Sequence, residues 1–244
     1  MNDGFYIGYE TPVPPRARPL VYGAVALILS IAVGLSVVLV ASQAPFANSS
    51  FAFGRADVFT GLVRFDPHPV LESGGSRMLL VAPGKHGADD IMRPFDSRVV
   101  ALRGAQIARD GQRMIEVIPD SISETAATVP AFVLGGAMDL GERTVHGEIV
   151  DAKCYLGVMN PGEGPGHRDC AVACLRGGLP PMLAVRSDTG IVVLFALVSP
   201  EGAPLGRGLA SWAGKPVTIT GRLQWMQPGD RWVLRTSLSQ IRWQ

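Results

Sequence analysis

Three cysteines and a histidine of this 244-residue chain follow one another closely, in the order Cys154, His167, Cys170 and Cys174. Their spacing is Cys-x12-His-x2-Cys-x3-Cys. Thiolates and imidazoles are ligands that zinc prefers, and they also bind copper. The pattern therefore predicts a metal site, and it leaves the choice between zinc and copper open.

The last three of these residues fit one face of a short helix. Residues 167–176 can form a helix that the two following glycines would end. At 3.6 residues per turn, these three side chains fall within a stripe of about 60°. Cys154 could supply a fourth ligand from across a glycine-rich loop. Four other side chains are further ligands or supports in this interpretation: Asp151, Met159, His146 and Met182.

Other cofactors agree less well with the sequence. It has no Cys-x-x-Cys-His motif for covalent haem, and three cysteines cannot make a four-cysteine iron–sulfur site. The Cys-x2-Cys pair that is typical of structural zinc sites is absent as well.

The cysteines have two other interpretations. A disulfide between Cys154 and either Cys170 or Cys174 would close a loop of roughly 16–20 residues and stabilise the fold by about 3 kcal/mol. The third thiol would then stay free near His167, and a thiol beside an imidazole can be reactive. A thiol–disulfide enzyme ranks last, because the Cys-x-x-Cys motif is missing.

The composition indicates a turn-rich β protein, with 29 Gly, 19 Pro and 47% hydrophobic residues. Lys and Arg number 22 and Asp and Glu number 21, so the net charge is close to zero. Nucleic-acid binding needs a surplus of positive charge on some face. We therefore expect no nucleic-acid partner.

One segment is long and apolar enough to cross a membrane. No Asp, Glu, Lys or Arg occurs from Pro19 to Gly54, and residues 20–41 are nearly all apolar. About 20 apolar residues in a helix span the hydrocarbon core of a bilayer. Because the run is longer than the core of a typical signal peptide, we expect an uncleaved anchor at 19–42 that contacts the lipid through 20–41.

The charges beside this segment predict its orientation. Arg16 and Arg18 precede it, and the next cation is Arg55. Positive side chains stay on the cytoplasmic side, so residues 1–18 would form a cytoplasmic tail. We expect a single-pass protein of the bacterial inner membrane with its C-terminal domains in the periplasm, where disulfides persist.

The part after the anchor contains two similar units. Alternating apolar residues and Asp-Gly or Gly-Asp turns predict strands and hairpins in both. The expected fold is mainly β: an N-terminal transmembrane helix followed by two tandem OB-like β-barrels of about five strands each. The expected boundaries are a linker at 43–55, a first barrel at 56–120, a linker at 121–143 and a second barrel at 144–244, with a Cys/His insertion at 152–180.

The insertion follows from aligning the two units. Residues 60–66 resemble 146–151, residues 78–81 resemble 182–185, and residues 98–104 resemble 215–221. Between the first two matched segments, the first unit spends 17 residues from Gly61 to Met78, and the second spends 35 from Gly147 to Met182. The cysteines and His167 lie in the extra length, and loops on a rigid scaffold commonly carry function.

The second unit contains Gly-x-Ile-x-Asp-x-x-Cys, His-x-x-Cys-x-x-x-Cys-x-x-Gly-Gly and the late segment Ala-Gly-Lys-Pro-Val-Thr-Ile-Thr-Gly. With these motifs, residues 146–243 resemble a group of small exported bacterial β-barrel domains of unassigned function. The resemblance implies an OB-like barrel in which the four Cys/His positions act as a set. The matching residues are Asp151, Cys154, His167, Cys170, Cys174, Gly177, Gly178, Gly214 and Gly221.

Together these features predict a membrane-anchored periplasmic protein with a Cys/His metal or redox site. We expect an accessory or electron-transfer subunit of a membrane redox or metal-handling system rather than an enzyme, with a membrane or periplasmic protein as its partner. The alternative is a disulfide-stapled structural or interaction module of an envelope complex that holds no metal.

Overall fold

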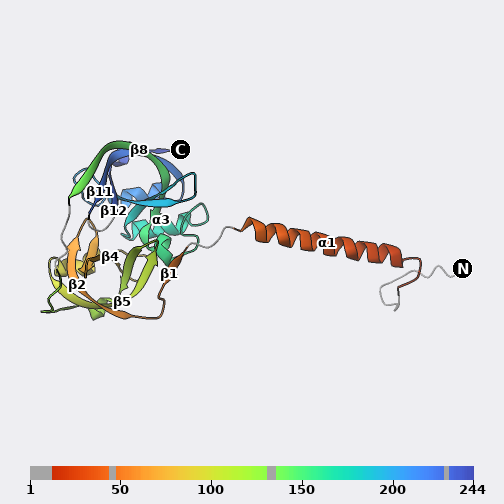
Figure 1. Cartoon of the computed structure of the whole chain (residues 1–244), viewed down its shortest axis with the longest axis horizontal. Coiled ribbons are helices and arrows are strands. Elements are labelled where there is room, and N and C mark those ends of the chain that lie inside the picture. The colour runs from red at the N-terminus through yellow and green to blue at the C-terminus, as the bar shows by residue number, and fades with distance from the viewer. Residues whose placement is uncertain (1–12, 44–47, 131–135, 228–230) are drawn as a thin grey trace. The chain divides into compact units, whose positions relative to one another are not determined.

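The computed structural model describes residues 13–43, 48–130, 136–227 and 231–244 (Figure 1). The chain forms two compact units, residues 1–45 and residues 46–244. Most of the expected cytoplasmic tail, and parts of both expected linkers, lie outside the described residues.

The first unit contains the helix α1 (Arg18–Ser42), whose most apolar window has a mean hydropathy of 2.8. The hydroxyl groups of its two central serines are hydrogen-bonded within the helix. The hydroxyls of Ser30 and Ser36 donate to the carbonyl oxygens of Ala26 and Ala32, each at 2.8 Å. Such internal pairing is what a lipid environment demands. The helix is long and apolar enough to cross a membrane, which fits the predicted anchor.

The second unit begins with a closed five-stranded barrel. Its strand order is β5-β2-β3-β4-β6, and pairing of β6 with β5 closes the barrel. β4 and β6 run parallel, whereas the other neighbours are antiparallel. The elements are β1 (Ser49–Phe51), β2 (Asp57–Phe65), β3 (Pro69–Ser73), β4 (Ser76–Val81), α2 (Asp89–Met92), η1 (Arg93–Phe95), β5 (Val99–Arg109), β6 (Gln112–Val117), η2 (Pro119–Ser121) and β7 (Ser123–Glu124).

A second barrel repeats this topology. Its order is β11-β8-β9-β10-β12, closed by pairing of β12 with β11, and β10 and β12 are again parallel. The predicted fold class is thus confirmed: mainly β, with an apolar N-terminal helix and two barrels. The elements are β8 (Ala137–Asp151), η3 (Cys154–Val158), α3 (Arg168–Arg176), β9 (Pro181–Arg186), β10 (Val192–Val198), η4 (Gly206–Trp212), β11 (Pro216–Met226), β12 (Arg231–Arg235), η5 (Leu238–Gln240) and β13 (Ile241–Trp243).

Glycines at equivalent positions let each barrel close. A Cβ on Gly61 of β2 would lie 2.6 Å from a backbone oxygen of β3, and one on Gly147 of β8 would lie 2.5 Å from a backbone oxygen of β9. Gly104 of β5 and Gly221 of β11 approach the final strand of their barrels just as closely, at 2.5 and 2.4 Å. No side chain fits there, which explains why glycine recurs in both repeats.

The structure corrects one part of the sequence alignment. Met78 lies on β4, the third strand of its barrel, whereas Met182 lies on β9, the second strand. Similar apolar patterns on neighbouring strands caused the mismatch. The true counterpart of β9 is β3, so the first barrel joins its first two strands through residues 66–68 alone, and the second uses residues 152–180. The insertion is therefore larger than the alignment indicated.

The expected linkers contain strands. β1 lies within 43–55 and pairs with β5, and β7 lies within 121–143 and pairs with β5 as well. β8 begins at Ala137, before the expected start of the second barrel at 144, because it pairs with β11 as far as Met226. Short or polar strands carry too weak an alternation to be recognised in sequence.

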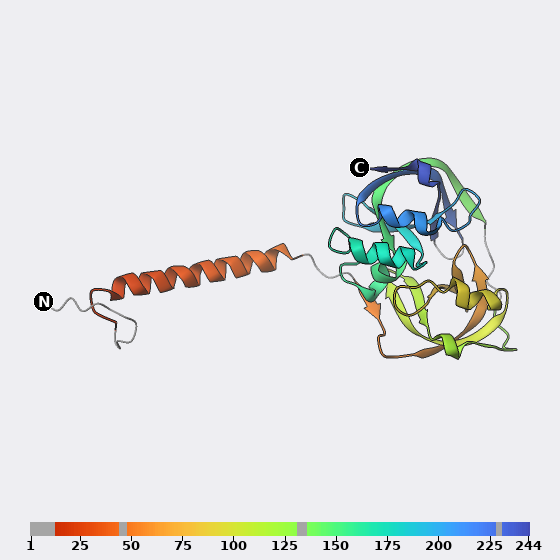
Figure 2. The same cartoon turned by 180° about the vertical axis from the view of Figure 1, so that it is seen from behind.

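The insertion, which Figure 2 draws in green and cyan, packs between the barrels. Each barrel has its own apolar core, and a third cluster joins them. In that cluster Val81, Ile107 and Met114 of the first barrel pack with residues of the insertion. The insertion residues in the cluster are Ala152, Cys154, Tyr155, Leu156, Cys174 and Leu179, with Cys170 and Val158 partly buried beside them.

Candidate metal centre

The site begins where β8 ends. Asp151 is fully buried at the last position of the strand, and its Oδ1 accepts a hydrogen bond of 2.8 Å from the backbone N–H of Cys154. An aspartate that binds the backbone a few residues later stabilises a tight turn. The turn brings Cys154 to the start of η3, which faces the helix α3.

The helix α3 carries the other two cysteines and ends where the sequence predicts. Gly178 has a φ of +90°, its N–H bonds the carbonyl of Leu175 at 3.1 Å, and the next N–H bonds the carbonyl of Cys174 at 3.1 Å. This pair of bonds around a left-handed glycine is the Schellman ending of a helix. It fixes the helix end within one turn of the thiols.

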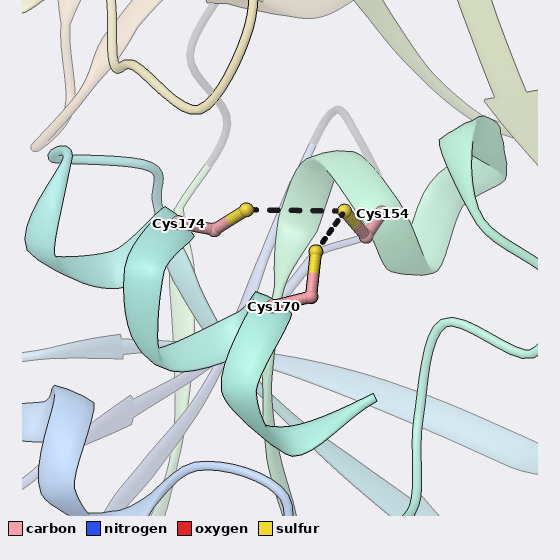
Figure 3. Close-up of side chains that lie close together, drawn as sticks. All are labelled: Cys154, Cys170 and Cys174. Atoms are coloured by element: carbon pink, nitrogen blue, oxygen red, sulfur yellow. Dashed lines mark hydrogen bonds between the residues drawn. The ribbon is translucent and has the colours of Figure 1, made fainter. Parts of the chain in front are cut away.

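The three thiols meet between these two elements (Figure 3). The Sγ of Cys154 lies 3.9 Å from the Sγ of Cys170 and 3.9 Å from the Sγ of Cys174. All three sulfurs lie within 4.8 Å of one another, and no disulfide joins them. Cys154 and Cys174 are buried, and Cys170 is partly exposed. This is one compact thiol cluster with a single partly open side.

His167 lies beside this cluster and forms a ligand group with only one of its cysteines, Cys154. Its Nε2 is 3.1 Å from Oδ2 of Asp151, and both side chains are buried. His167, Asp151 and Cys154 form a second group whose ligand atoms lie within 4.8 Å of one another. The four expected ligands thus form two groups that share Cys154. Nδ1 of His167 is buried and has no hydrogen-bond partner among the described residues.

The thiols share their protons unequally. The hydrogen bond with Cys174, burial and the Asp151 carboxylate raise the pKa of Cys154. The same hydrogen bond lowers the pKa of Cys174, against the effect of burial. Burial and the neighbouring Cys174 raise the pKa of Cys170. A thiolate in this cluster is therefore stabilised by a hydrogen bond from a neighbouring thiol.

The other expected ligands differ in their placement. Met182 is buried in the same apolar cluster as Cys154 and Cys174. Met159 is 44% exposed beyond η3, and His146 is exposed on β8, where its Nδ1 lies 2.9 Å from the hydroxyl of Thr218. Among the described residues, His146 belongs to neither of the two ligand groups.

The first barrel supplies a residue that the sequence did not point to. The turn after β4, with the sequence Pro-Gly-Lys-His-Gly, looks like an ordinary surface turn, yet it contacts the insertion. Lys85 in this turn has a raised pKa, chiefly through its interaction with Cys170, and the negative charges of the Cys174 and Cys154 thiolates contribute. It places a positive charge beside a cluster that becomes anionic when the thiols ionise.

Lys153, a residue of the insertion, contacts the same turn of the first barrel. Its side chain is 2% exposed, and its Nζ donates to the carbonyl oxygens of Ala82 at 2.8 Å and Gly84 at 2.6 Å. It also forms an ion pair with Glu116 of β6. A buried ammonium persists only when charge and hydrogen bonds both compensate it, as they do here.

Glycines complete this contact. The N–H of Gly87 donates to the carbonyl of Gly177 at 3.0 Å. A Cβ on Gly177 would lie 1.8 Å from the carbonyl oxygen of Lys85, and one on Gly87 would lie 2.2 Å from that of Gly178. The backbones of the two barrels therefore touch directly at the end of α3.

Comparison with known proteins adds no identification: no protein-family model, no curated protein and no solved structure matches this chain.

Proposed function

We propose that this protein is a membrane-anchored periplasmic subunit that holds a soft metal ion at Cys154, Cys170 and Cys174 and serves a membrane redox or metal-handling system. The observation that carries the proposal is the meeting of three thiols from two elements, within 4.8 Å of one another. Thiolate ligands favour zinc and monovalent copper over hard cations.

The sulfur spacing supports this assignment. Two thiolates bound tetrahedrally to one zinc, at about 2.3 Å each, lie about 3.8 Å apart. The two distances from Cys154 are both 3.9 Å. A metal would thus fit among the sulfurs with small adjustments, and Lys85 would offset part of the negative charge of the thiolates.

His167 is the proposed fourth ligand. A histidine that binds a metal through one nitrogen commonly donates from the other to a carboxylate, which fixes the ring. Asp151 holds Nε2 in this way, and the unpartnered Nδ1 is the atom left to bind. Metal binding would draw the ring and the thiols together, because they now form two overlapping groups.

The experiment is metal analysis and thiol counting of the full chain, purified in detergent without reductant under oxygen-free conditions. We expect about one equivalent of zinc or copper per chain, with no disulfide. Cys154→Ser should remove most of the metal, because this residue belongs to both groups. Stoichiometric disulfide with one free thiol and no metal would contradict the proposal.

A pair of histidine variants provides the control. His167→Ala should weaken metal binding, whereas His146→Ala should leave it unchanged, since His146 is exposed and hydrogen-bonds Thr218. Equal metal content in both variants would remove His167 from the ligand set while leaving the cysteines in it.

The disulfide-stapled module is the second candidate, because Cys154 is equally near two partners. Oxidation to either pair would need the sulfurs to move from 3.9 Å to about 2.05 Å. A thiol–disulfide enzyme has less support, since Cys174, whose pKa is lowered, is buried, and the pKa of the more exposed Cys170 is raised. Thiol counting without reductant distinguishes these cases from metal binding.

A further inference from the structure

Three of the four proposed ligands are closed off from solvent. Cys154 is 4% exposed, Cys174 is 1% exposed and His167 is 3% exposed. The side chains around them are buried as well, among them Tyr155 of η3 and Leu175 of α3. An ion held by these three ligands therefore cannot be reached from solution through this part of the insertion.

Cys170 is the exception among the four. It is partly exposed on α3, although its Sγ lies only 3.9 Å from the Sγ of the buried Cys154. The thiols thus run from the surface into the interior of the site, as the close-up in Figure 3 shows. A molecule that approaches the ion from solution reaches Cys170 first.

The 82–87 turn of the first barrel lies against the insertion near this open side. The N–H of Gly87 donates to the carbonyl of Gly177, at the end of α3, at 3.0 Å. Lys153 donates to two backbone carbonyls of the turn, at 2.8 and 2.6 Å. The backbone of the turn is therefore fixed to the insertion and cannot open as a loop without breaking these bonds.

One side chain of this turn reaches the open thiol. Burial raises the pKa of Cys170, and the ammonium group of Lys85 lies close enough to oppose that rise. Lys85 is itself exposed, and a lysine side chain is a flexible four-carbon chain. It can therefore turn into solvent and uncover Cys170 while the backbone of the turn stays in place.

The chemistry of a soft ion decides what can exchange with it. An ion held by thiolates passes most readily to other soft ligands, and thiolates are the most common of these in proteins. In such an exchange the bond from the ion to an incoming sulfur forms and the bond to Cys170 breaks. The incoming thiol gives up its proton and Cys170 takes one up, so the exchange needs no oxidant or reductant.

We propose that the ion enters and leaves the site past Cys170, by exchange with the thiolates of a metal-carrying protein, and that Lys85 controls this passage. The inference rests on the proposed function, because it requires the thiols to bind an ion. Lys85 acts as a cover and not as a ligand. Its removal should therefore change the rate of exchange and leave the amount of bound metal unchanged.

The first experiment tests the opening and does not depend on the metal. The full chain in detergent is reduced, freed of metal and reductant, and treated with a limiting amount of iodoacetamide. We expect Cys170 to be modified at least tenfold faster than Cys154 or Cys174, as measured by mass spectrometry of the peptides. Preferential modification of either buried thiol would overturn the proposed passage, whatever the metal content of the chain.

The second experiment measures how fast the zinc-loaded full chain loses its ion to dithiothreitol, a thiol probe, and to EDTA, a carboxylate probe. We expect faster transfer to dithiothreitol at equal concentration. Lys85→Ala should raise this rate at least threefold at unchanged zinc content, and Lys85→Arg, which keeps the charge and a long side chain, should restore it. Lys215→Ala is the matched control, because Lys215 is an exposed lysine of the second barrel.

Each outcome bears on a different part of the inference. Unchanged transfer from a zinc-loaded Lys85→Ala protein would overturn the role of Lys85. Transfer to EDTA at least as fast as to dithiothreitol would overturn the thiol class of the partner. A chain that binds no ion would contradict the proposed function itself, and this inference with it.

Discussion

Within the four residues from Asp151 to Cys154, three side chains have different partners. The carboxylate of Asp151 hydrogen-bonds His167 and the backbone of the turn, Lys153 donates to the backbone of the first barrel, and Cys154 contacts the other thiols. Single substitutions there should therefore separate metal binding from stability.

Asp151→Asn should weaken metal binding about 10–100-fold, the usual effect of losing a carboxylate that orients a ligating histidine. Competition with a chromogenic chelator would measure the affinity. Asp139→Asn is the matched control, because Asp139 lies on the same strand and pairs with Arg222 at the surface. Equal affinity in Asp151→Asn and the unaltered protein would mean that His167 does not bind the ion.

Lys153→Met should lower the free energy of unfolding by about 3–5 kcal/mol, as expected when one partner of a buried ion pair is removed. The loss leaves Glu116 and two backbone carbonyls without their donor. Thermal unfolding of the detergent-solubilised chain would show it. Lys215→Met should have a small effect, because Lys215 is exposed and its ammonium group lies over the ring of Trp243.

Glu148 provides a pH-dependent test. Burial raises the pKa of this carboxyl group, although the N–H of Gly164 bonds its Oε1 at 2.6 Å and opposes the shift. The folded state therefore holds the proton more tightly than the unfolded state, so the contribution of Glu148 to stability falls as the pH rises from about 4 through its folded pKa. Glu148→Gln should gain melting temperature relative to the unaltered protein over this range. A constant difference from pH 4 to 8 would contradict the assignment.

The residue types of the site could be predicted from sequence, but their supporting contacts could not. Cys154, Cys170, Cys174 and His167 are recognisable because their spacing alone is unusual. Lys85 and Lys153 have no such signal, since their roles arise only when the two barrels pack together. Whether the ligands form one group or two depends on differences of about an ångström in side-chain position. A helical period of 3.6 residues per turn does not fix side-chain positions that finely.

At the scale of elements, the insertion is a helix pressed against a turn of the other barrel. The two backbones approach this closely because Gly177 and Gly87 have no side chains, and not because side chains fit together there. The sequence predicted the glycine pair as a helix end, which is correct, but not as a contact surface. Strand alternation likewise predicted two barrels while confusing the second strand with the third.

Gly177→Ala should destabilise the fold by at least about 1–3 kcal/mol, the usual cost of overpacking, because the new methyl group would meet a backbone oxygen that cannot rotate away. Thermal unfolding and metal content should both fall. Gly166→Ala is the control within the same insertion, since nothing lies within 4 Å of its Cβ. A stable Gly177→Ala protein would mean that the barrels separate easily.

At the scale of the whole molecule, the proposed function assigns membrane anchoring to the apolar helix and metal binding to the two-barrel unit. The full chain should stay in the membrane pellet at alkaline pH, and a chain reduced to residues 46–244 should appear in the soluble fraction. An alkaline phosphatase fused after Gln244 should be active in bacteria, because this enzyme needs the disulfides that form in the periplasm. An inactive but well-expressed fusion would reverse the proposed orientation.

The docking of Lys153 and Gly177 on the 82–87 turn has an evolutionary consequence. Substitutions in the first barrel that change the path of this turn alter the surroundings of the thiols, although none of the proposed ligands lies in that barrel. Selection on the site therefore extends across both repeats, and a larger residue at 177 could be accepted only with a compensating change near 85. Among related sequences, these positions should vary together, and recombination between the repeats should be purged.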